Sequence, residues 1–279
     1  MNFMPAQNPL GEKISYSGQY DAGLLFPIAR TESRQHLVLA GELPFRGEDR
    51  WTAYEVSWLD QQGKPQVRLA EFLLNSDSPN IIESKSFKLY LNSFNHTRFD
   101  DEQQVKSQFI TDLSAVAGSV VTVEMMPLNS AHMLLMDGPI GICLDGIDVT
   151  IDEYHPNPKL LKVLTSQSVN EVLYSHLLKT NCPVTGQPDW ATVFIEYTGP
   201  TICQHSLLKY IISFREHHDF HENSVERLFC DINAYCCPEH LAVYARYTRR
   251  GGLDINPLRS NYPEGIGVLG CNTMRIIRQ

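Results

Sequence analysis

The feature that most constrains the fold of this chain is an internal repeat. Four pairs of segments line up in one order and at nearly one offset: 63–66 with 186–189, 86–95 with 206–215, 101–102 with 221–222, and 119–124 with 240–245. Each pair shares few identical residues, so a single match carries little weight. Four matches in the same order indicate that the chain contains a duplicated domain.

Each half is predicted to follow the order ββααββ, which places the chain in the α+β class. Two alternating segments, 54–59 and 67–72, flank a turn with glycine and proline and predict a hairpin. Residues 172–178 alone would fit a helix, but the repeat makes them the first strand of a second hairpin, which 191–197 completes. The other expected elements are the helices 84–95, 102–117, 205–216 and 222–236 and the closing strands 119–126, 147–152, 241–248 and 273–278.

Length and composition agree with two folded domains. The chain has 279 residues, of which 43% are hydrophobic, enough to build proper cores. Pro156, Pro158 and the polar residues around them mark the expected junction, so the predicted domains are 1–155 and 156–279. The net charge is −9 and there is no basic block, which argues against a nucleic-acid partner.

The cysteines and the first residues favour a cytoplasmic protein. Seven cysteines are spread along the chain without a C-x-x-C pair, a pattern typical of a reduced compartment. The first nine residues lack the basic and apolar regions of a signal peptide, and no apolar run reaches the length of a membrane helix. We therefore expect no membrane partner, and we expect six of the seven cysteines to be small buried hydrophobic residues.

Cys182 is the exception among the cysteines. An acid, Asp189, follows it by seven residues, and the pair His221-Glu222 follows about forty residues later. A thiol with an acid and a histidine nearby can act as a nucleophile, because neighbouring groups supply and remove protons. Cys182 is therefore the candidate nucleophile of this chain.

Three further segments each admit two interpretations. His217 and His221 have the four-residue spacing of two metal ligands on one helix face, but the acids around them also fit the start of a helix. Glu83 fits a helix cap, or a carboxylate that accepts from adjacent N–H groups of a flat heterocycle. Arg249 and Arg250, ahead of two glycines, suit a phosphate or a solvent-exposed strand end.

Residues 265–270 spell G-x-G-x-x-G, the pattern of a dinucleotide-binding loop. That loop needs a strand before it, a helix after it and an acid about twenty residues further on. Only nine residues follow here, so we predict a flexible turn instead.

Taken together, these motifs resemble the QueF family of nitrile reductases. The resemblance lies in the segment 83–95, the spacing from cysteine to aspartate, the set Phe220-His221-Glu222, and the run 247–257. It covers nearly the whole chain and matches the long form of the family, in which two modules follow each other. It implies NADPH-dependent reduction of 7-cyano-7-deazaguanine to its aminomethyl derivative in queuosine biosynthesis, with two NADPH per turnover.

The same resemblance implies a role for each candidate residue. Cys182 would attack the nitrile carbon to give a covalent thioimide, Asp189 would donate a proton, and His221 would assist binding and proton transfer. The residues implied to bind the substrate are Ile82, Glu83, Ser84, His221 and Glu222. The residues implied to contact NADPH are Ser84, Lys85, Arg250 and Gly251, and no metal site is implied.

The resemblance also implies a fold. Family members have tandem tunnelling-fold (T-fold) modules, each a ββααββ unit with an antiparallel sheet and helices on one face. By analogy with other T-fold proteins, we expect a homodimer. Leu59 and Gln66 align with Cys182 and Asp189, so the first half is expected to be inactive while it supplies Glu83. We therefore expect the substrate between the two halves.

Two other functions stay open on the sequence. The first is a zinc-dependent hydrolase of the GTP cyclohydrolase type, with Cys182 and histidines as ligands. The second is a non-catalytic T-fold protein that binds a purine or a pterin. The sequence assigns no role to Cys236 and Cys237.

Overall fold

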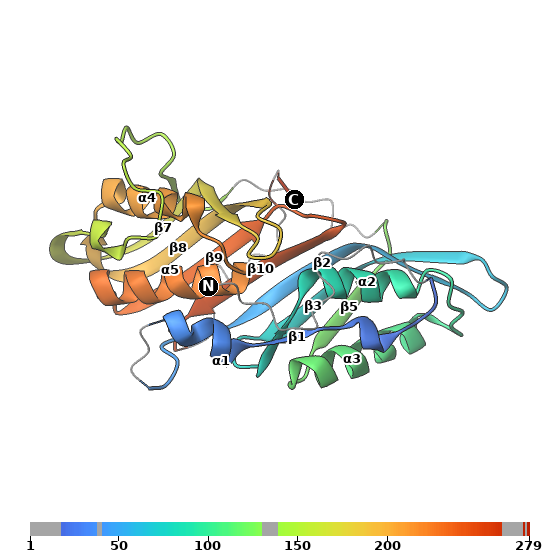
Figure 1. The fold of residues 1–279 in the computed structure, drawn as a ribbon. Helices are drawn as coiled ribbons and strands as arrows, with labels where there is room; N and C mark the ends of the chain where they lie inside the picture. The colour runs from blue at the N-terminus through green and yellow to red at the C-terminus, as the bar shows by residue number, and fades with distance from the viewer. Residues whose placement is uncertain (1–17, 38–40, 130–138, 264–275, 277) are drawn as a thin grey trace. The chain divides into compact units, whose positions relative to one another are not determined.

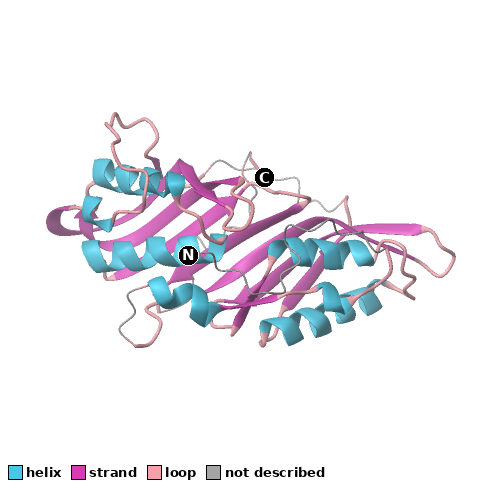
Figure 2. Ribbon diagram, viewed as in Figure 1, coloured by secondary structure: helices cyan, strands magenta, loops and turns pink. Residues whose placement is uncertain are grey.

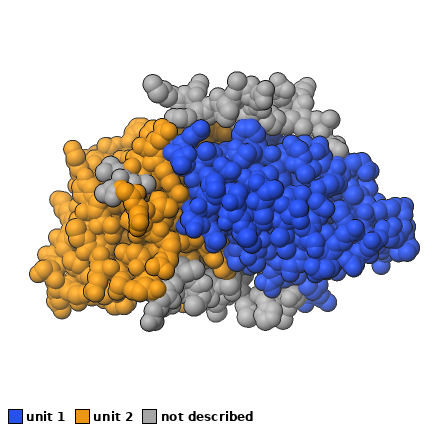
Figure 3. Space-filling model, turned by 90° about the horizontal axis from the view of Figure 1, so that it is seen from below, with its two compact units in different colours: residues 1–33, 51–130, 250–253 blue, residues 34–50, 131–249, 254–279 orange. Residues whose placement is uncertain are grey.

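The computed structural model describes residues 18–37, 41–129, 139–263, 276, 278 and 279. Among them, two compact groups form (Figure 3): unit 1 holds Met1–Ser33, Trp51–Ser130 and Arg250–Leu253, and unit 2 holds Arg34–Arg50, Ala131–Arg249 and Asp254–Gln279. Each unit is therefore built from segments that are distant in the sequence. The division of the chain at 155/156 stays a prediction.

Unit 1 carries the elements of the first half of the repeat (Figure 1). The hairpin predicted from the sequence is present, with β3 (Pro65–Asn75) between β2 (Arg46–Leu59) and β5 (Thr122–Met126); the residues of β2 up to Arg50 are counted with unit 2. Helices α2 (Ser84–Ser93) and α3 (Glu102–Ala117) cover one face of these strands. The smaller elements are η1 (Ala22–Leu24), β1 (Pro27–Ala29), α1 (Arg30–Ser33) and β4 (Asn80–Ile82), and β1 pairs with β4.

Unit 2 carries the second half and shows the full ββααββ order (Figure 2). Its strands are β7 (Val163–Asn181), β8 (Pro188–Ile202), β9 (His240–Tyr247) and β10 (Leu253–Ser260), which pair antiparallel in that order. Its helices are α4 (Gln204–Ile212), extended by η5 (Ser213–Glu216), and α5 (His221–Cys236). The smaller elements are η2 (Arg34–His36), β6 (Ile142–Cys143) and η4 (Pro158–Leu160). The predicted α+β class is confirmed.

Matching hydrogen bonds confirm the repeat. The Tyr90 hydroxyl donates to Asp112 at 2.6 Å in unit 1, and the Tyr210 hydroxyl donates to Asp231 at 2.6 Å in unit 2. In both cases the tyrosine lies on the first helix and the aspartate on the second. The same tyrosine–aspartate hydrogen bond therefore joins the two helices of each half.

The hairpin turns correct one detail of the alignment. The backbone N–H of Asp60 donates to Lys64, whereas that of Cys182 donates to Gln187. The second turn is thus one residue longer, and Cys182 corresponds to Asp60 rather than to Leu59. The Asp60 carboxylate accepts hydrogen bonds from the N–H groups of Gln62 and Lys64 and from the side chain of Gln66 at 3.0 Å.

Two expected closing strands differ from the structure. Residues 147–152 form no strand, although Ile147 and Val149 pack against the core of unit 2. Their alternation reflects a half-buried segment, not a paired one. The strand expected at 273–278 lies largely outside the described residues, and β10 is the strand that pairs with β9. A two-residue turn at Gly251 and Gly252, with φ of 62° and 75°, opens this hairpin.

Each unit has its own core. In unit 1, aromatic rings meet edge to face, including Trp51 against Phe87 and Phe72 against Phe109. In unit 2, aliphatic residues of β7–β9 pack against α4 and α5. Across the described residues, no helix is long and apolar enough to cross a membrane.

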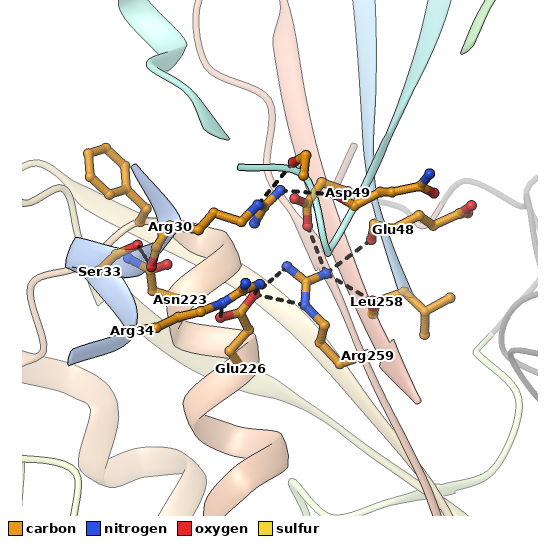
Figure 4. A network of polar contacts seen from close by, with 12 residues as sticks. Arg30, Ser33, Arg34, Glu48, Asp49, Asn223, Glu226, Leu258 and Arg259 are labelled. Atoms are coloured by element: carbon orange, nitrogen blue, oxygen red, sulfur yellow. Dashed lines mark hydrogen bonds and ion pairs between the residues drawn. The ribbon is translucent and has the colours of Figure 1, made fainter. Parts of the chain in front are cut away.

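A buried ionic cluster lies beneath α5 in unit 2 (Figure 4). Glu226 accepts hydrogen bonds from Arg34 at 2.7 and 2.8 Å and from Arg259 at 2.9 and 3.0 Å. Arg259 also pairs with Asp49 at 2.8 Å, and Glu226, Asp49 and Arg259 are all fully buried. Each of these two buried carboxylates thus has an arginine beside it, as burial of a charge requires.

Candidate functional site

Cys182 is the first residue after β7, in the turn that leads to β8. Hydrogen bonds between Cys182 and Gln187 and between Gly186 and Cys182 close this turn. The Thr185 N–H lies 3.5 Å from the Cys182 Sγ atom, so a backbone donor faces the sulfur. Cys182 is partly exposed.

Asp189 lies near the start of β8, across the hairpin from Thr180. Its Oδ2 atom lies 3.4 Å from the His221 Nε2 atom. Both side chains are largely buried, with exposed fractions of 8% and 13%. The structure therefore brings together the predicted proton donor and the predicted histidine.

His221 begins α5, and Tyr247 holds its ring in place. The two rings are parallel within 2° with their centroids 3.7 Å apart. Tyr247 is fully buried at the end of β9, where it pairs with Ala191 of β8. Tyr247 is the first residue of the run 247–257, but the sequence predicted no role for it. A stack between residues of β9 and α5 cannot be inferred from the spacing of residues along the chain.

The residue before Cys182 ties the turn to the segment ahead of α5. The Asn181 N–H donates to the His217 carbonyl at 2.8 Å, and the Asp219 N–H donates to the Asn181 carbonyl at 3.1 Å. These bonds fix the end of β7 against the residues that precede His221. Two chain segments about forty residues apart are therefore held in register at the candidate nucleophile.

The hydrogen bonds at the start of α5 show whether His221 and Glu222 cap this helix. Phe220 is the N-cap residue and makes no side-chain cap bond. Asp219 instead accepts from the Phe220 N–H at 2.8 Å and from the Asn223 side chain at 2.7 Å. Phe220 thus holds the N-cap position, and His221 and Glu222 are the first two residues of the helix. The Glu222 side chain is buried.

The structure shows that Glu83 caps α2. Its two carboxylate oxygens accept from the Lys85 and Ser86 N–H groups at 3.0 and 2.6 Å. A carboxylate has about four acceptor positions, so capping leaves room for further donors. Burial raises the pKa of Glu83, and the backbone hydrogen bonds and the charges of Lys85 and Arg250 partly offset this rise.

The remaining predicted residues of unit 1 surround Glu83. Ile82 ends β4 and is buried, and Ser84 begins α2. Lys85 and Arg250 both lower the pKa of Glu83 through their charge, which places two cations near the N-terminus of α2. Arg250 and Gly251 are exposed in the β9–β10 turn. Two cations, a helix N-terminus and an exposed glycine turn are features suited to phosphate groups.

The candidate residues thus fall into two sets, each described within its own unit. The thiol set in unit 2 consists of Cys182, Asp189, His221 and Glu222. The carboxylate set in unit 1 consists of Ile82, Glu83, Ser84, Lys85, Arg250 and Gly251. The glycine-rich segment 265–270 lies outside the described residues.

The metal interpretation of the histidines gains no support. Among the described residues, neither His217 nor His221 belongs to a group of three ligand atoms close enough to share an ion, and Cys182 belongs to none either. The nearest carboxylate to the His217 Nε2 atom is Asp219, at 3.6 Å.

The cysteine expectation was largely wrong. The six described cysteines are free, but only Cys236 among the five other than Cys182 is buried. Cys143 and Cys237 are exposed. Cys237 ends α5 in the left-handed conformation, with φ of 48°, at the position that Gly118 occupies after α3. It acts there as a helix terminator, which its residue type did not reveal.

Comparison with known proteins gives consistent matches along the chain. Residues 16–125 match the family model for the N-terminal part of the nitrile reductase 7-cyano-7-deazaguanine reductase, and residues 188–264 match the model for QueF-like proteins. These two matches fall on the two halves of the repeat.

Similar curated proteins share the name NADPH-dependent 7-cyano-7-deazaguanine reductase. The protein from Azoarcus sp. is 56% identical over 91% of this chain and 90% of its own length. The protein from Bordetella avium is 55% identical over 91% and 93%, and that from Albidiferax ferrireducens is 52% identical over 94% and 96%. The chain therefore belongs to the family of NADPH-dependent 7-cyano-7-deazaguanine reductases.

Proposed function

We propose that this protein reduces the nitrile of 7-cyano-7-deazaguanine to an aminomethyl group with NADPH, in the biosynthesis of queuosine. The protein is an oxidoreductase with NADPH as its cofactor, as its relatives are named. The observation that supports the chemistry most strongly is that Asp189, 3.4 Å from His221, pairs across the hairpin with Thr180, two residues before Cys182. It offers a nucleophile and a proton source in one place.

Cys182 adds to the nitrile carbon and forms a C–S bond, which turns the C≡N group into the C=N group of a thioimide. The Thr185 N–H lies 3.5 Å from the sulfur atom that forms this bond. Asp189 gives a proton to the nitrogen. The covalent intermediate divides one difficult reduction into two easier steps.

NADPH, when bound, supplies hydride to this carbon, twice per turnover. After the first hydride the C–S bond breaks, and Cys182 leaves as thiolate from an imine. Protonation of that imine accompanies the second hydride and gives the primary amine. His221, 3.4 Å from Asp189, returns a proton to the acid between the two steps.

The carboxylate set binds the ligands. Glu83 and Glu222 accept the N–H groups of the deazaguanine ring, with Ser84 and the backbone of Ile82 beside them. Lys85, Arg250, Gly251 and Ser84 hold NADPH, whose phosphates suit the two cations.

Intact mass spectrometry after mixing with 7-cyano-7-deazaguanine, without NADPH, tests the mechanism. We expect the wild type to gain the mass of one substrate, and Cys182→Ala to gain none. Cys237→Ala is the matched control, since Cys237 is also a free, accessible cysteine, and it should still gain the mass. An unmodified wild type, or an adduct that persists in Cys182→Ala, contradicts the thioimide.

A second assay separates reduction from the alternatives. Loss of NADPH absorbance, with two NADPH consumed per nitrile, is expected for the purified protein. No turnover would favour a binding protein, and an activity that requires stoichiometric zinc would favour a hydrolase.

We also propose a homodimer, by analogy with T-fold assemblies. Light scattering coupled to size exclusion should give twice the chain mass of 31.7 kDa. A mass of one chain would contradict this proposal.

A further inference from the structure

A second group of reactive side chains lies in unit 2, outside the residues that the proposed mechanism uses. It consists of Cys143 and Asp145 on and after β6, and His176 on β7. One ligand atom from each residue lies within 4.8 Å of the other two. Strand pairing holds these segments together, because Cys143 pairs with Tyr174 and the Leu144 N–H donates to the Tyr174 carbonyl at 2.9 Å.

Hydrogen bonds orient the Asp145 carboxylate. The Ser175 hydroxyl donates to its Oδ1 atom at 2.6 Å, and the His176 N–H lies 3.1 and 3.2 Å from its two oxygens. A carboxylate held in this way is pre-positioned for an ion, as in metal centres whose ligands are fixed by an outer shell of hydrogen bonds.

A second contact orients the imidazole. The His176 Nδ1 atom lies 2.8 Å from the hydroxyl of Thr192, which is fully buried on β8. When Nδ1 carries the proton and donates to Thr192, the Nε2 lone pair is left for a metal. This pairing of one ring nitrogen with a protein acceptor is the usual arrangement of a metal-binding histidine.

The kind of ligand selects the metal. Thiolate, imidazole and carboxylate together suit Zn²⁺, whereas Mg²⁺ and Ca²⁺ require oxygen ligands. Tetrahedral zinc at bond lengths of about 2.0–2.3 Å needs ligand atoms about 3.3–3.8 Å apart. Cys143 is exposed, so rotation of its side chain can close the remaining distance.

The surrounding charges are compatible with a divalent ion. Thiolate and carboxylate contribute two negative charges, which neutralise Zn²⁺. Arg278 is the nearby cation: it donates to the His176 carbonyl at 2.7 Å and to the Ala191 carbonyl at 2.9 Å, and its charge acts on Asp145. Both hydrogen bonds come from the Arg278 Nη2 atom and are accepted by backbone carbonyls.

We propose that Cys143, Asp145 and His176 bind one Zn²⁺ ion, with water as the fourth ligand. The ion ties β6 and the turn after it to the β7–β8 hairpin. This site is independent of the reductase mechanism, because none of its ligands belongs to the thiol set or the carboxylate set.

Cobalt titration of the full-length, chelator-treated protein tests the site, since Co²⁺ replaces Zn²⁺ and reports thiolate ligation by a charge-transfer band. The background is Cys182→Ser, which removes the other accessible thiol near histidines. We expect one equivalent of Co²⁺ to give the band, and one equivalent of Zn²⁺ to abolish it.

Three variants in that background define the outcome. Cys143→Ser should lose the band and weaken Zn²⁺ binding by at least about 100-fold, and Thr192→Val should weaken it by about 10- to 100-fold. Cys237→Ser, a second exposed cysteine, should bind as the background does. Zn²⁺ should raise the melting temperature of the background protein but not that of Cys143→Ser. Absence of the band in the background protein, or its persistence in Cys143→Ser, would overturn the proposal.

Discussion

Glu226 provides a sharp test of what holds unit 2 together. It is fully buried and accepts four hydrogen bonds, two from Arg34 and two from Arg259. Glu226→Gln keeps the shape of the side chain but removes its charge and one of its two acceptor oxygens. The buried cluster then carries a net charge of one, because Asp49 alone remains against two arginines.

The cost of this change follows from burial. Breaking a buried ion pair from one side destabilises a protein by about 3–5 kcal/mol, because the remaining charge stays buried without a partner. At about 2–4 °C per kcal/mol, the expected fall in melting temperature is roughly 6–20 °C. The matched control is Glu102→Gln, since Glu102 pairs with Arg68 at 2.6 Å but their side chains are 39% and 25% exposed. That change should cost no more than about 1 kcal/mol.

Thermal melting followed by circular dichroism measures both variants. A second measurement adds Arg34→Met to Glu226→Gln, which restores the charge balance and should recover part of the loss. Two outcomes would show that the cluster does not stabilise unit 2 through charge pairing. In the first, the melting temperature of Glu226→Gln lies within two degrees of that of Glu102→Gln. In the second, adding Arg34→Met to Glu226→Gln lowers the melting temperature by as much as Arg34→Met does alone.

Three further predictions concern the site. Tyr247→Leu removes the ring stacked on His221 and should lower kcat by up to about tenfold, whereas Tyr247→Phe keeps the ring and should keep kcat. Equal losses of kcat in the two variants would refute a role for the stack. Burial raises the pKa of Glu83, so this carboxylate takes up a proton at a higher pH than an ordinary glutamate does. KM for the nitrile should therefore rise as pH falls through this raised pKa, and Glu83→Gln should remove that pH dependence. A pH profile of KM that is the same in Glu83→Gln as in the wild type would count against this role of Glu83. Lys85→Ala should raise KM for NADPH about 10- to 100-fold and leave KM for the nitrile unchanged, with the turn residue Lys64→Ala as a control; a matching rise in both KM values would argue against a cofactor contact.

The repeat is the reason that so much of the fold could be predicted. It assigned 172–178 to a strand when periodicity favoured a helix, and β7 confirms that assignment. The four long helical segments were placed within a few residues of their observed ends. Hairpins and helices are local structures, so their residues carry the pattern themselves.

The errors arose where pairing depends on distant partners. Residues 147–152 alternate like a strand, but their apolar side packs on a core while their backbone joins no sheet. The stack of Tyr247 on His221 and the cluster of Cys143, Asp145 and His176 join elements that lie far apart in the sequence. Spacing along the chain contains no record of such contacts, so neither could be predicted.

The first hairpin turn can be compared with the second, position by position. Asp60 and Gln66 occupy the positions of Cys182 and Asp189, and their side chains meet at 3.0 Å. Their contact shows that, in the first hairpin, side chains at these two positions come within hydrogen-bond distance. In the first copy this contact closes a loop, in which the Asp60 carboxylate also accepts hydrogen bonds from the backbone N–H groups of Gln62 and Lys64. The second copy has a turn that is one residue longer and places Cys182 and Asp189 at these positions, so the two copies differ both in turn length and in the side chains that they present.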